Sequence, residues 1–469
     1  MLAVEKITLN YETTLTGCET LPVFGWIITS TLRDVQQRSW RLQLSAQEDF
    51  AQCLFDSGEM HDDRSSNIEL PDVACQHSTR YFVRVHITDN HGEESGWSPA
   101  ATFITGLPAR AWQGVFISAE TPQDKDNSKG TLLRHAFSLP DGDDIVSAVV
   151  HASALGLYQL WINGEKVGRD ELSPGWTSYH HHLLYQTRDV TEHLREGENV
   201  IGAMVGAGWY KGDMSFNRYR NYYGQQTGFI CHMVVTLRDG SQRIIATDAH
   251  WQGSDDAILF AEIYDGEVYD ARREQRGWSE PAFSAGHWRA VTTLAAETSV
   301  LQPQTACPVQ EIERLAPCSI ITTPKGETVL DFGQNLSGWV EFRVRGAAGE
   351  RVVLRHFEVL DAEGNVYLAN LRTAKQCIDY TLRGEGEECF HPHFTFQGFR
   401  YVLIERWPGT PTRDDFVAVV LHSAMTPTGH IETSNADLNQ LHHNIMWGLK
   451  GNFVDIPTDC PQRDERLGW

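Results

Sequence analysis

The sequence lacks the segments that would carry a protein to a membrane or hold it there. Its start, Met-Leu-Ala-Val-Glu-Lys, has no basic region followed by the long apolar core of a signal peptide. No run of about eighteen apolar residues occurs anywhere in the 469 residues. These absences predict a cytoplasmic protein that has no membrane partner.

Paired cysteines and positive charge are also scarce. Nine cysteines are scattered along the chain, their number is odd, and no Cys-x-x-Cys pair occurs. We therefore expect reduced, mostly buried thiols instead of a disulfide framework or a zinc site. Lys and Arg total 39 against 62 Asp and Glu, a net charge of −23. Because this charge repels phosphates, it excludes nucleic acid and anionic membranes as partners and fits a neutral ligand.

The remaining composition is that of a globular protein, with 41% apolar and 22% charged residues. The length predicts about three domains of ~150 residues each. Apolar and polar residues alternate over 81–87, and a last strand follows at 101–104. This period of two predicts half-buried strands, and with them a fibronectin-III-like or immunoglobulin-like β-sandwich over residues 1–107.

Two further β domains are expected after the linker. In residues 108–298, the strand Leu-Tyr-Gln-Leu-Trp-Ile at 157–162 runs into Asn163-Gly164, a strong hairpin turn. Residues 299–428 contain further apolar strands, among them Val-Val-Leu-Arg-His-Phe at 352–357. The chain is thus predicted to be mainly β.

Two motifs of the second domain suggest bound groups but have the wrong spacing. Three glycines, at 206, 208 and 212, do not match a phosphate-binding Gly-x-Gly-x-x-Gly, and no βαβ pattern follows them. Three consecutive histidines at 180–182 point to opposite faces of a strand, which disfavours one shared metal ion. We therefore expect no cofactor and no metal.

Aromatic side chains of the second domain are candidates for carbohydrate binding, because an aromatic ring can stack on the apolar face of a sugar. The candidates are Trp176, Trp209 and Tyr210. Packing in a β core is the alternative for each of them.

The hydrophobic period changes near residue 433. Ser434 begins an acceptable capping box with Asp437, and apolar residues then recur every three or four positions. The pattern predicts an amphipathic helix over 434–450, with an apolar face formed by Leu438, Leu441, Ile445 and Leu449. We expect this face to be exposed, because it wants partners that this chain does not supply, although the helix can nucleate against the third β domain.

The last fifteen residues, 455–469, are the richest in chemical groups. They contain four carboxylates, two arginines and a terminal tryptophan, and Pro457 and Pro461 prevent a regular helix. A stiff loop with these groups suits sugar chemistry, in which carboxylates exchange protons and an indole stacks on the ring. A solvated charged loop is the alternative.

Four stretches resemble, in order, the bacterial α-L-rhamnosidases of glycoside hydrolase family 78. They are Ser-Pro-Gly-Trp-Thr-Ser-Tyr at 173–179, Asp-Phe-Gly-Gln-Asn at 331–335, Asn-Leu-Arg-Thr-Ala-Lys at 370–375 with the aromatic run 394–401, and Asp-Cys-Pro-Gln-Arg-Asp-Glu-Arg-Leu-Gly-Trp at 459–469. The resemblance implies serial β-sandwich and jelly-roll domains followed by an (α/α)6 catalytic barrel, of which residues 429–469 would be an incomplete start. It also implies inverting hydrolysis of terminal non-reducing α-L-rhamnose from glycosides or oligosaccharides, by two carboxylic acids and one water.

Carried onto this sequence, the resemblance makes Glu465 the general acid. Asp459, Arg463 and Trp469 would bind the substrate. Like-charge repulsion from Asp459 and Asp464 would favour the protonated form that a general acid needs.

The family pattern continues beyond residue 469, where the general base would lie, so we expect the 469-residue chain to be truncated and inactive alone. A fragment, a stopped reading frame and a split protein are indistinguishable from sequence. A non-catalytic carbohydrate-binding or assembly protein derived from a rhamnosidase remains the alternative function. Without the barrel, we expect 455–469 to be mobile or held by another copy in a homodimer through the helix.

Overall fold

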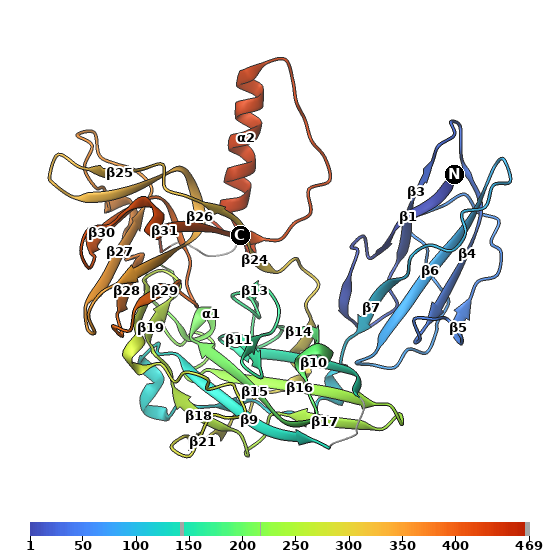
Figure 1. Cartoon of the computed structure of the whole chain (residues 1–469), viewed down its shortest axis with the longest axis horizontal. Coiled ribbons are helices and arrows are strands. Elements are labelled where there is room, and N and C mark those ends of the chain that lie inside the picture. Colours follow the sequence, from blue (N-terminus) through green and yellow to red (C-terminus); the bar gives the residue numbers. More distant parts are fainter. Residues whose placement is uncertain (141–144, 216, 465–469) are drawn as a thin grey trace.

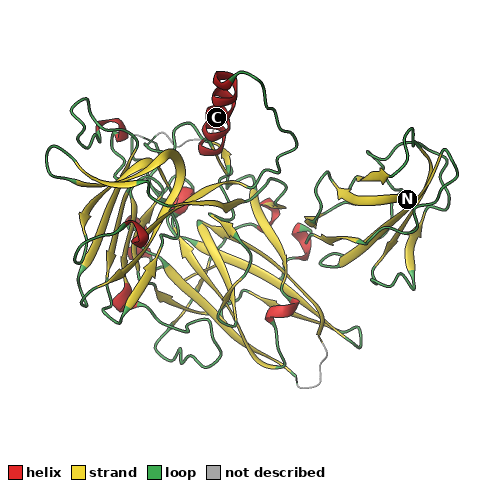
Figure 2. Ribbon diagram, turned by 45° about the horizontal axis from the view of Figure 1, so that its top comes forward, coloured by secondary structure: helices red, strands yellow, loops and turns green. Residues whose placement is uncertain are grey.

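The computed structural model describes residues 1–140, 145–215 and 217–464, and their architecture is mainly β with one long helix (Figures 1 and 2). Three sheet-built regions follow one another along the chain. No helix among these residues has both the length and the apolar character needed to cross a membrane. The predicted fold class is confirmed.

The N-terminal region is a β-sandwich with a five-stranded sheet in the order β2-β7-β6-β4-β5 and a two-stranded sheet β1-β3. Buried and partly exposed residues alternate along β6, as predicted, and the rings of Trp26 and Trp40 meet edge to face at 5.5 Å in its core. The strands are β1 (Leu2–Leu9), β2 (Leu15–Cys18), β3 (Phe24–Ser30), β4 (Gln37–Ser45), β5 (Cys53–Asp56), β6 (Arg80–Asp89) and β7 (Ala101–Thr105).

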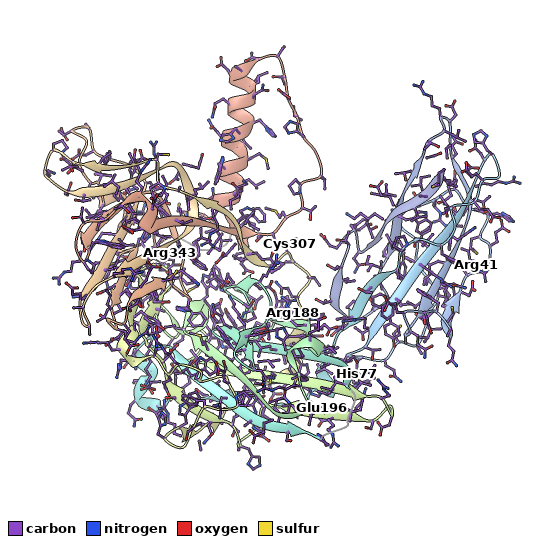
Figure 3. The ribbon with its side chains drawn as sticks, viewed as in Figure 1. Arg41, His77, Arg188, Glu196, Cys307 and Arg343 are labelled. Atoms are coloured by element: carbon purple, nitrogen blue, oxygen red, sulfur yellow. The ribbon has the colours of Figure 1, made fainter. Side chains whose placement is uncertain are left out.

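This sandwich meets the second region through buried polar contacts. Ser78 Oγ lies 2.8 Å from Nε2 of the fully buried His151, and the Leu107 N–H donates to the Tyr185 hydroxyl at 2.9 Å. Figure 3 labels the neighbouring His77 and Arg188 on the two sides of this junction.

The second region packs two antiparallel-rich sheets face to face, in the orders β22-β8-β16-β10-β14-β23 (with β17 on β16) and β12-β11-β15-β9-β18-β21. The predicted strand at 157–162 and its hairpin turn are confirmed. The elements are β8 (Ile117–Ser118), β9 (Thr131–Leu139), β10 (Ile145–Leu155), β11 (Leu157–Ile162), β12 (Glu165–Lys166), β14 (Leu183–Asp189), β15 (Gly197–Gly206), α1 (Gly208–Lys211), β16 (Gly228–Leu237), β17 (Gln242–Ala246), β18 (Gln252–Asp255), β21 (Arg289–Ala290), β22 (Thr292–Thr293) and β23 (Leu301–Pro303).

The third region is an eleven-stranded sheet that takes three of its strands from the middle of the second region's sequence. These are β13 (Asp170–Glu171), β19 (Ile258–Glu262) and β20 (Gly266–Asp270), and β20 runs parallel to β28. A domain limit at 298/299 remains a prediction, and the sheet crosses it. The other strands are β24 (Val309–Leu315), β25 (Ser319–Thr322), β26 (Thr328–Arg345), β27 (Arg351–Phe357), β28 (Cys377–Thr381), β29 (Glu387–Phe390), β30 (Gln397–Arg406) and β31 (Phe416–Ser423).

The long helix α2 (Ala436–Gly451) stands away from the sheets over most of its length (Figure 1). Its N-cap is Asn435, whose side chain accepts from the N–H groups of Asp437 and Leu438, so the predicted cap at Ser434 is wrong by one residue. The apolar face of the helix is exposed, as expected for a helix whose partners this chain does not supply. That face is 40–57% exposed at Leu438, Leu441, Ile445 and Leu449.

Short elements complete the described chain. The hairpin β32 (Phe453–Val454) and β33 (Ile456–Pro457) follows α2. Seven 3-10 turns occur at Ala109–Ala111, Pro122–Asp126, Thr191–His193, Ala271–Arg273, Thr298–Val300, Ala369–Leu371 and Arg413–Asp415.

All nine cysteines are free thiols, as predicted, but the expectation that most are buried is wrong. Only Cys231 is buried, whereas five are intermediate and three exposed. Among the described residues, no group of three or more His, Cys, Asp and Glu side chains is arranged to hold a metal ion.

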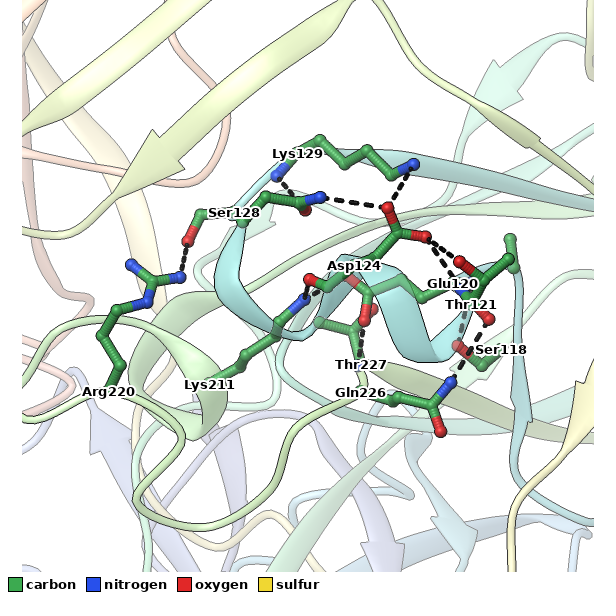
Figure 4. Close-up of polar contacts among 12 residues, drawn as sticks. Ser118, Glu120, Thr121, Asp124, Ser128, Lys129, Lys211, Arg220, Gln226 and Thr227 are labelled. Atoms are coloured by element: carbon green, nitrogen blue, oxygen red, sulfur yellow. Dashed lines mark hydrogen bonds and ion pairs between the residues drawn. The ribbon is translucent and has the colours of Figure 1, made fainter.

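A fully buried ion pair stabilises the second region beside α1 (Figure 4). Lys211 Nζ donates to Glu120 Oε1 at 2.7 Å and to the Asp124 carbonyl at 2.8 Å, while the Thr227 N–H donates to the other Glu120 oxygen. Both charged side chains have no exposed surface. Each charge therefore depends on its partner to offset the cost of leaving water.

Replacing Lys211 alone should therefore strongly destabilise this region. We expect Lys211→Met to lower its free energy of unfolding by about 3–5 kcal/mol, because Glu120 is left as an uncompensated buried charge. Adding Glu120→Gln should recover most of the loss. Arg276→Met, which removes an exposed pair with Glu385, should cost less than about 1 kcal/mol in the same thermal unfolding assay. Equal losses for the two single variants would contradict this assignment.

Candidate active-site segment and its cradle

Residues 455–464 are held at one end by the second region. Asp455, which directly follows β32, accepts the Trp176 N–H on Oδ2 at 2.7 Å. Its own N–H donates to Ser423 Oγ at 3.2 Å, at the end of β31. Gly175 allows this approach, because a Cβ there would lie 2.5 Å from Asp455 Oδ1. A side chain at position 175 would therefore keep the Asp455 carboxylate from the Trp176 N–H.

The other end is held by the third region. Asp464 is completely buried, and its Oδ2 accepts both the Thr373 N–H, at 3.0 Å, and the Thr373 hydroxyl. Between the two anchors, the segment lies directly on Gly398 of β30, where a Cβ would be 2.7 Å from the Gln462 nitrogen. The expectation that this segment is mobile or held by another copy is therefore wrong for 455–464, which its own chain fixes.

A bulge in β26 carries a further motif toward the segment. Pairing of β26 with β30 shifts register between Asp331 and Leu336, which leaves the intervening residues out of the ladder. Arg400 of β30 donates two hydrogen bonds, of 2.9 and 3.0 Å, to the Asp331 carboxylate. This contact lowers the pKa of the Asp331 carboxyl. Asn335 lies in this bulge, directly before ladder pairing resumes at Leu336.

A pocket of about 210 Å³ lies between this bulge, the C-terminal part of α2 and the segment. It combines two carboxylates, three amides, an indole and a thiol with small and apolar residues. The lining residues are Asn335, Leu336, Glu358, Trp447, Gly448, Gly451, Asn452, Asp459, Cys460, Pro461 and Gln462. Polar groups around one aromatic face are the usual equipment of a sugar-sized site.

Glu358 is the residue of this pocket that the sequence did not reveal. Its two oxygens accept from Asn335 Nδ2 at 3.0 Å and from Asn370 Nδ2 at 3.4 Å. Burial raises the pKa of its carboxyl, while the Asn335 hydrogen bond and the positive charge of Arg463 oppose the rise. One carboxylate thus joins three stretches that the sequence shows only as separate motifs. The available signal was an acid directly after the apolar strand β27, flanked by two of the motifs.

The predicted site residues of the terminal motif divide into two groups. Asp459 lines the pocket, and Arg463 is close enough to Glu358 for its charge to act on that carboxyl. The general acid predicted at Glu465 and the stacking residue predicted at Trp469 lie outside the described residues. Their roles remain predictions.

The aromatic candidates of the second region are mostly structural. Trp209 is 3% exposed, and the Trp176 ring stacks over it at 6.2 Å with 9° between their planes. Trp209 therefore offers no free face to a sugar, and its prediction as a carbohydrate-binding residue is corrected on that ground. Trp176 and Tyr210 are partly exposed, but Trp176 Nε1 already donates to Tyr223.

The Gly175 contact can be tested by adding one methyl group. Gly175→Ala should displace Asp455 and leave the Trp176 N–H without its hydrogen-bond acceptor. The loosened segment should then be cleaved by trypsin after Arg463 about tenfold faster. Gly197→Ala is the matched control, because both glycines have positive φ (+94 and +76) but a Cβ at Gly197 meets nothing within 4 Å. Equal cleavage in both variants would remove the proposed anchor.

The Asp455 anchor should make stability depend on pH. Burial raises the pKa of this carboxyl from 3.8 to about 6, so the folded chain holds the proton in a range where the unfolded chain has released it. Protonation then stabilises the folded chain, and this stabilisation, up to about 3 kcal/mol, is lost as pH rises from about 4 to about 6. Asp455→Asn should flatten the melting temperature over that window relative to the unsubstituted chain. An unchanged pH profile would contradict the assignment.

Comparison with known proteins identifies the family to which this chain is similar. Four family models match successive parts of the chain. They describe a Rha78A-like N-terminal immunoglobulin domain (residues 4–109), an α-L-rhamnosidase N-terminal domain (143–313), a bacterial α-L-rhamnosidase concanavalin-like domain (321–422) and a bacterial α-L-rhamnosidase six-hairpin glycosidase domain (426–469).

Individual relatives agree with these models. An α-L-rhamnosidase of Streptomyces avermitilis is 42% identical over 382 residues, which are 80% of this chain and 36% of that protein. The structure of an α-L-rhamnosidase from Aspergillus terreus superposes on this chain with a TM-score of 0.94 at 37% sequence identity. The superposition includes all of this chain and 55% of the Aspergillus chain. A Streptomyces avermitilis α-L-rhamnosidase complexed with L-rhamnose gives the same TM-score at 27% identity, with 62% of that chain covered. The chain spans about a third to three fifths of these relatives, and along that span it belongs to the bacterial α-L-rhamnosidase family.

Proposed function

We propose that this chain forms the N-terminal, substrate-binding part of an α-L-rhamnosidase. Such an enzyme releases terminal non-reducing α-L-rhamnose from glycosides with inversion. The observation that carries the proposal is the pocket that joins Asp459 of the terminal motif to Glu358 and Trp447. Carboxylates suit sugar hydroxyls, and an indole suits the apolar face of a deoxy sugar. The Streptomyces relative whose structure contains L-rhamnose supports the same ligand class.

The residues of the terminal motif take distinct roles in this proposal. Asp459 accepts hydrogen bonds from sugar hydroxyls, and Arg463 supports the same subsite. Glu465 protonates the leaving oxygen as general acid, and Trp469 is a substrate-binding residue. A water on the opposite ring face requires a second carboxyl about 6.5–9.5 Å from the acid. We propose that this base comes from a part of the catalytic barrel that the 469 residues do not include.

The proposal predicts sugar binding without turnover by the 469-residue chain. We expect calorimetric titration with methyl α-L-rhamnoside to detect binding, and Asp459→Asn to weaken it by about tenfold through loss of charge-assisted hydrogen bonds. Asp414→Asn changes an exposed acid of the third region and should leave binding unchanged.

Incubation of the same chain with an aryl α-L-rhamnoside should release no detectable aryl alcohol. Turnover matching that of a full-length relative would show that a base lies within the 469 residues. Absence of rhamnoside binding would remove the proposed function itself.

A further inference from the structure

We propose that Glu358 contacts the sugar directly, so that the third β region supplies a specificity-determining carboxylate to the binding pocket. The inference rests on the proposed function and adds to it a residue outside the terminal motif. Its ligand class is a pyranoside whose hydroxyls can donate to a fixed carboxylate. The pocket would then be shared between a β-sheet and the start of the catalytic region.

The first argument is the remaining hydrogen-bonding capacity of Glu358. A carboxylate offers about four lone-pair sites. Among the described residues, Asn335 and Asn370 each donate one amide hydrogen to it. About two acceptor sites are left on a side chain that lines the pocket, enough for one or two sugar hydroxyls.

The second argument is preorganisation. The two amides hold one carboxylate oxygen each, which fixes the terminal rotation of the Glu358 side chain. Asn335 lies in the bulge of β26 that Arg400 anchors at its start through Asp331. A group held in this way loses little rotational freedom on binding, so its hydrogen bonds contribute more to affinity and discrimination.

The third argument is placement relative to the terminal motif. Glu358 and Asp459 line one pocket of about 210 Å³, and Trp447 of α2 completes its wall. The positive charge of Arg463 acts on Glu358. A sugar held by Asp459 in a space of this size reaches the second carboxylate as well, because the pocket has room for a single ring.

A purely structural role for Glu358 makes a different prediction. If its function is to hold Asn335, Asn370 and Arg463, its replacement changes affinity for every ligand by the same factor. A direct contact changes the penalty for removing one particular hydroxyl. A cycle that combines protein and ligand substitutions separates these cases.

The test measures affinities of the 469-residue chain and its Glu358→Gln variant for methyl α-L-rhamnoside and its 2-, 3- and 4-deoxy analogues. We expect Glu358→Gln to weaken the parent glycoside by about tenfold. Removing one of the three hydroxyls should lower the affinity of the unsubstituted chain. The same removal should lower the affinity of the variant by less than about twofold. Glu363→Gln, an exposed acid five positions later, is the matched control and should reproduce the unsubstituted pattern. Thermal unfolding checks that each variant is folded.

Each outcome decides the proposal. If every analogue loses the same factor with both proteins, Glu358 does not touch the sugar and the inference is wrong, while the proposed function stands. If the unsubstituted chain binds no rhamnoside, both are wrong. Should Glu358→Gln fail to fold, Glu358→Asp withdraws the carboxylate by one methylene at unchanged charge and is judged by the same cycle.

Discussion

The position of the terminal motif depends on carboxylates that accept backbone hydrogen bonds from two different β regions. Asp455 is held by the N–H of Trp176 and Asp464 by that of Thr373. Both donors lie in loops that connect strands of these regions, so a segment with little secondary structure of its own is positioned by the regions beneath it. Burying a carboxylate is costly without such donors, which makes any undocked arrangement of a buried acid unfavourable.

The stretches that resemble a family signature therefore serve largely as a platform. Gly175 and Gly398 carry no side chain because the segment occupies that space. Arg400 and Asp331 lock the bulge that presents Asn335. The segment contributes Asp459, Cys460 and Gln462 to the pocket, and residues far away in sequence contribute its other polar groups and position the segment. The β regions thus take part in the site even where they touch no ligand.

Elements that depend on neighbouring residues could be predicted from the sequence. The meeting of side chains from distant segments in one pocket could not. Alternation located β6 and the Asn163-Gly164 turn located β11, because both signals are properties of neighbouring residues. The helix cap was misplaced by one position because Ser434 and Asn435 are both good caps and tertiary context decides between them. Trp209 could not be distinguished from a surface aromatic by composition. Glu358 is a lone acid at a strand end, and no spacing rule reveals that two amides and an arginine meet it in space.

The parallel pair of β20 and β28 has a consequence for how the chain is made. Gly266 pairs with Cys377, so during synthesis the hairpin β19–β20 waits for a partner 111 residues later. At about 5–20 residues per second, this delay is roughly 6–20 s. Throughout that time the nascent second region exposes an unpaired strand edge, which is a template for pairing with other chains. The strand pairing that unites the two regions in the finished protein thus leaves an edge open to aggregation while the chain is being made.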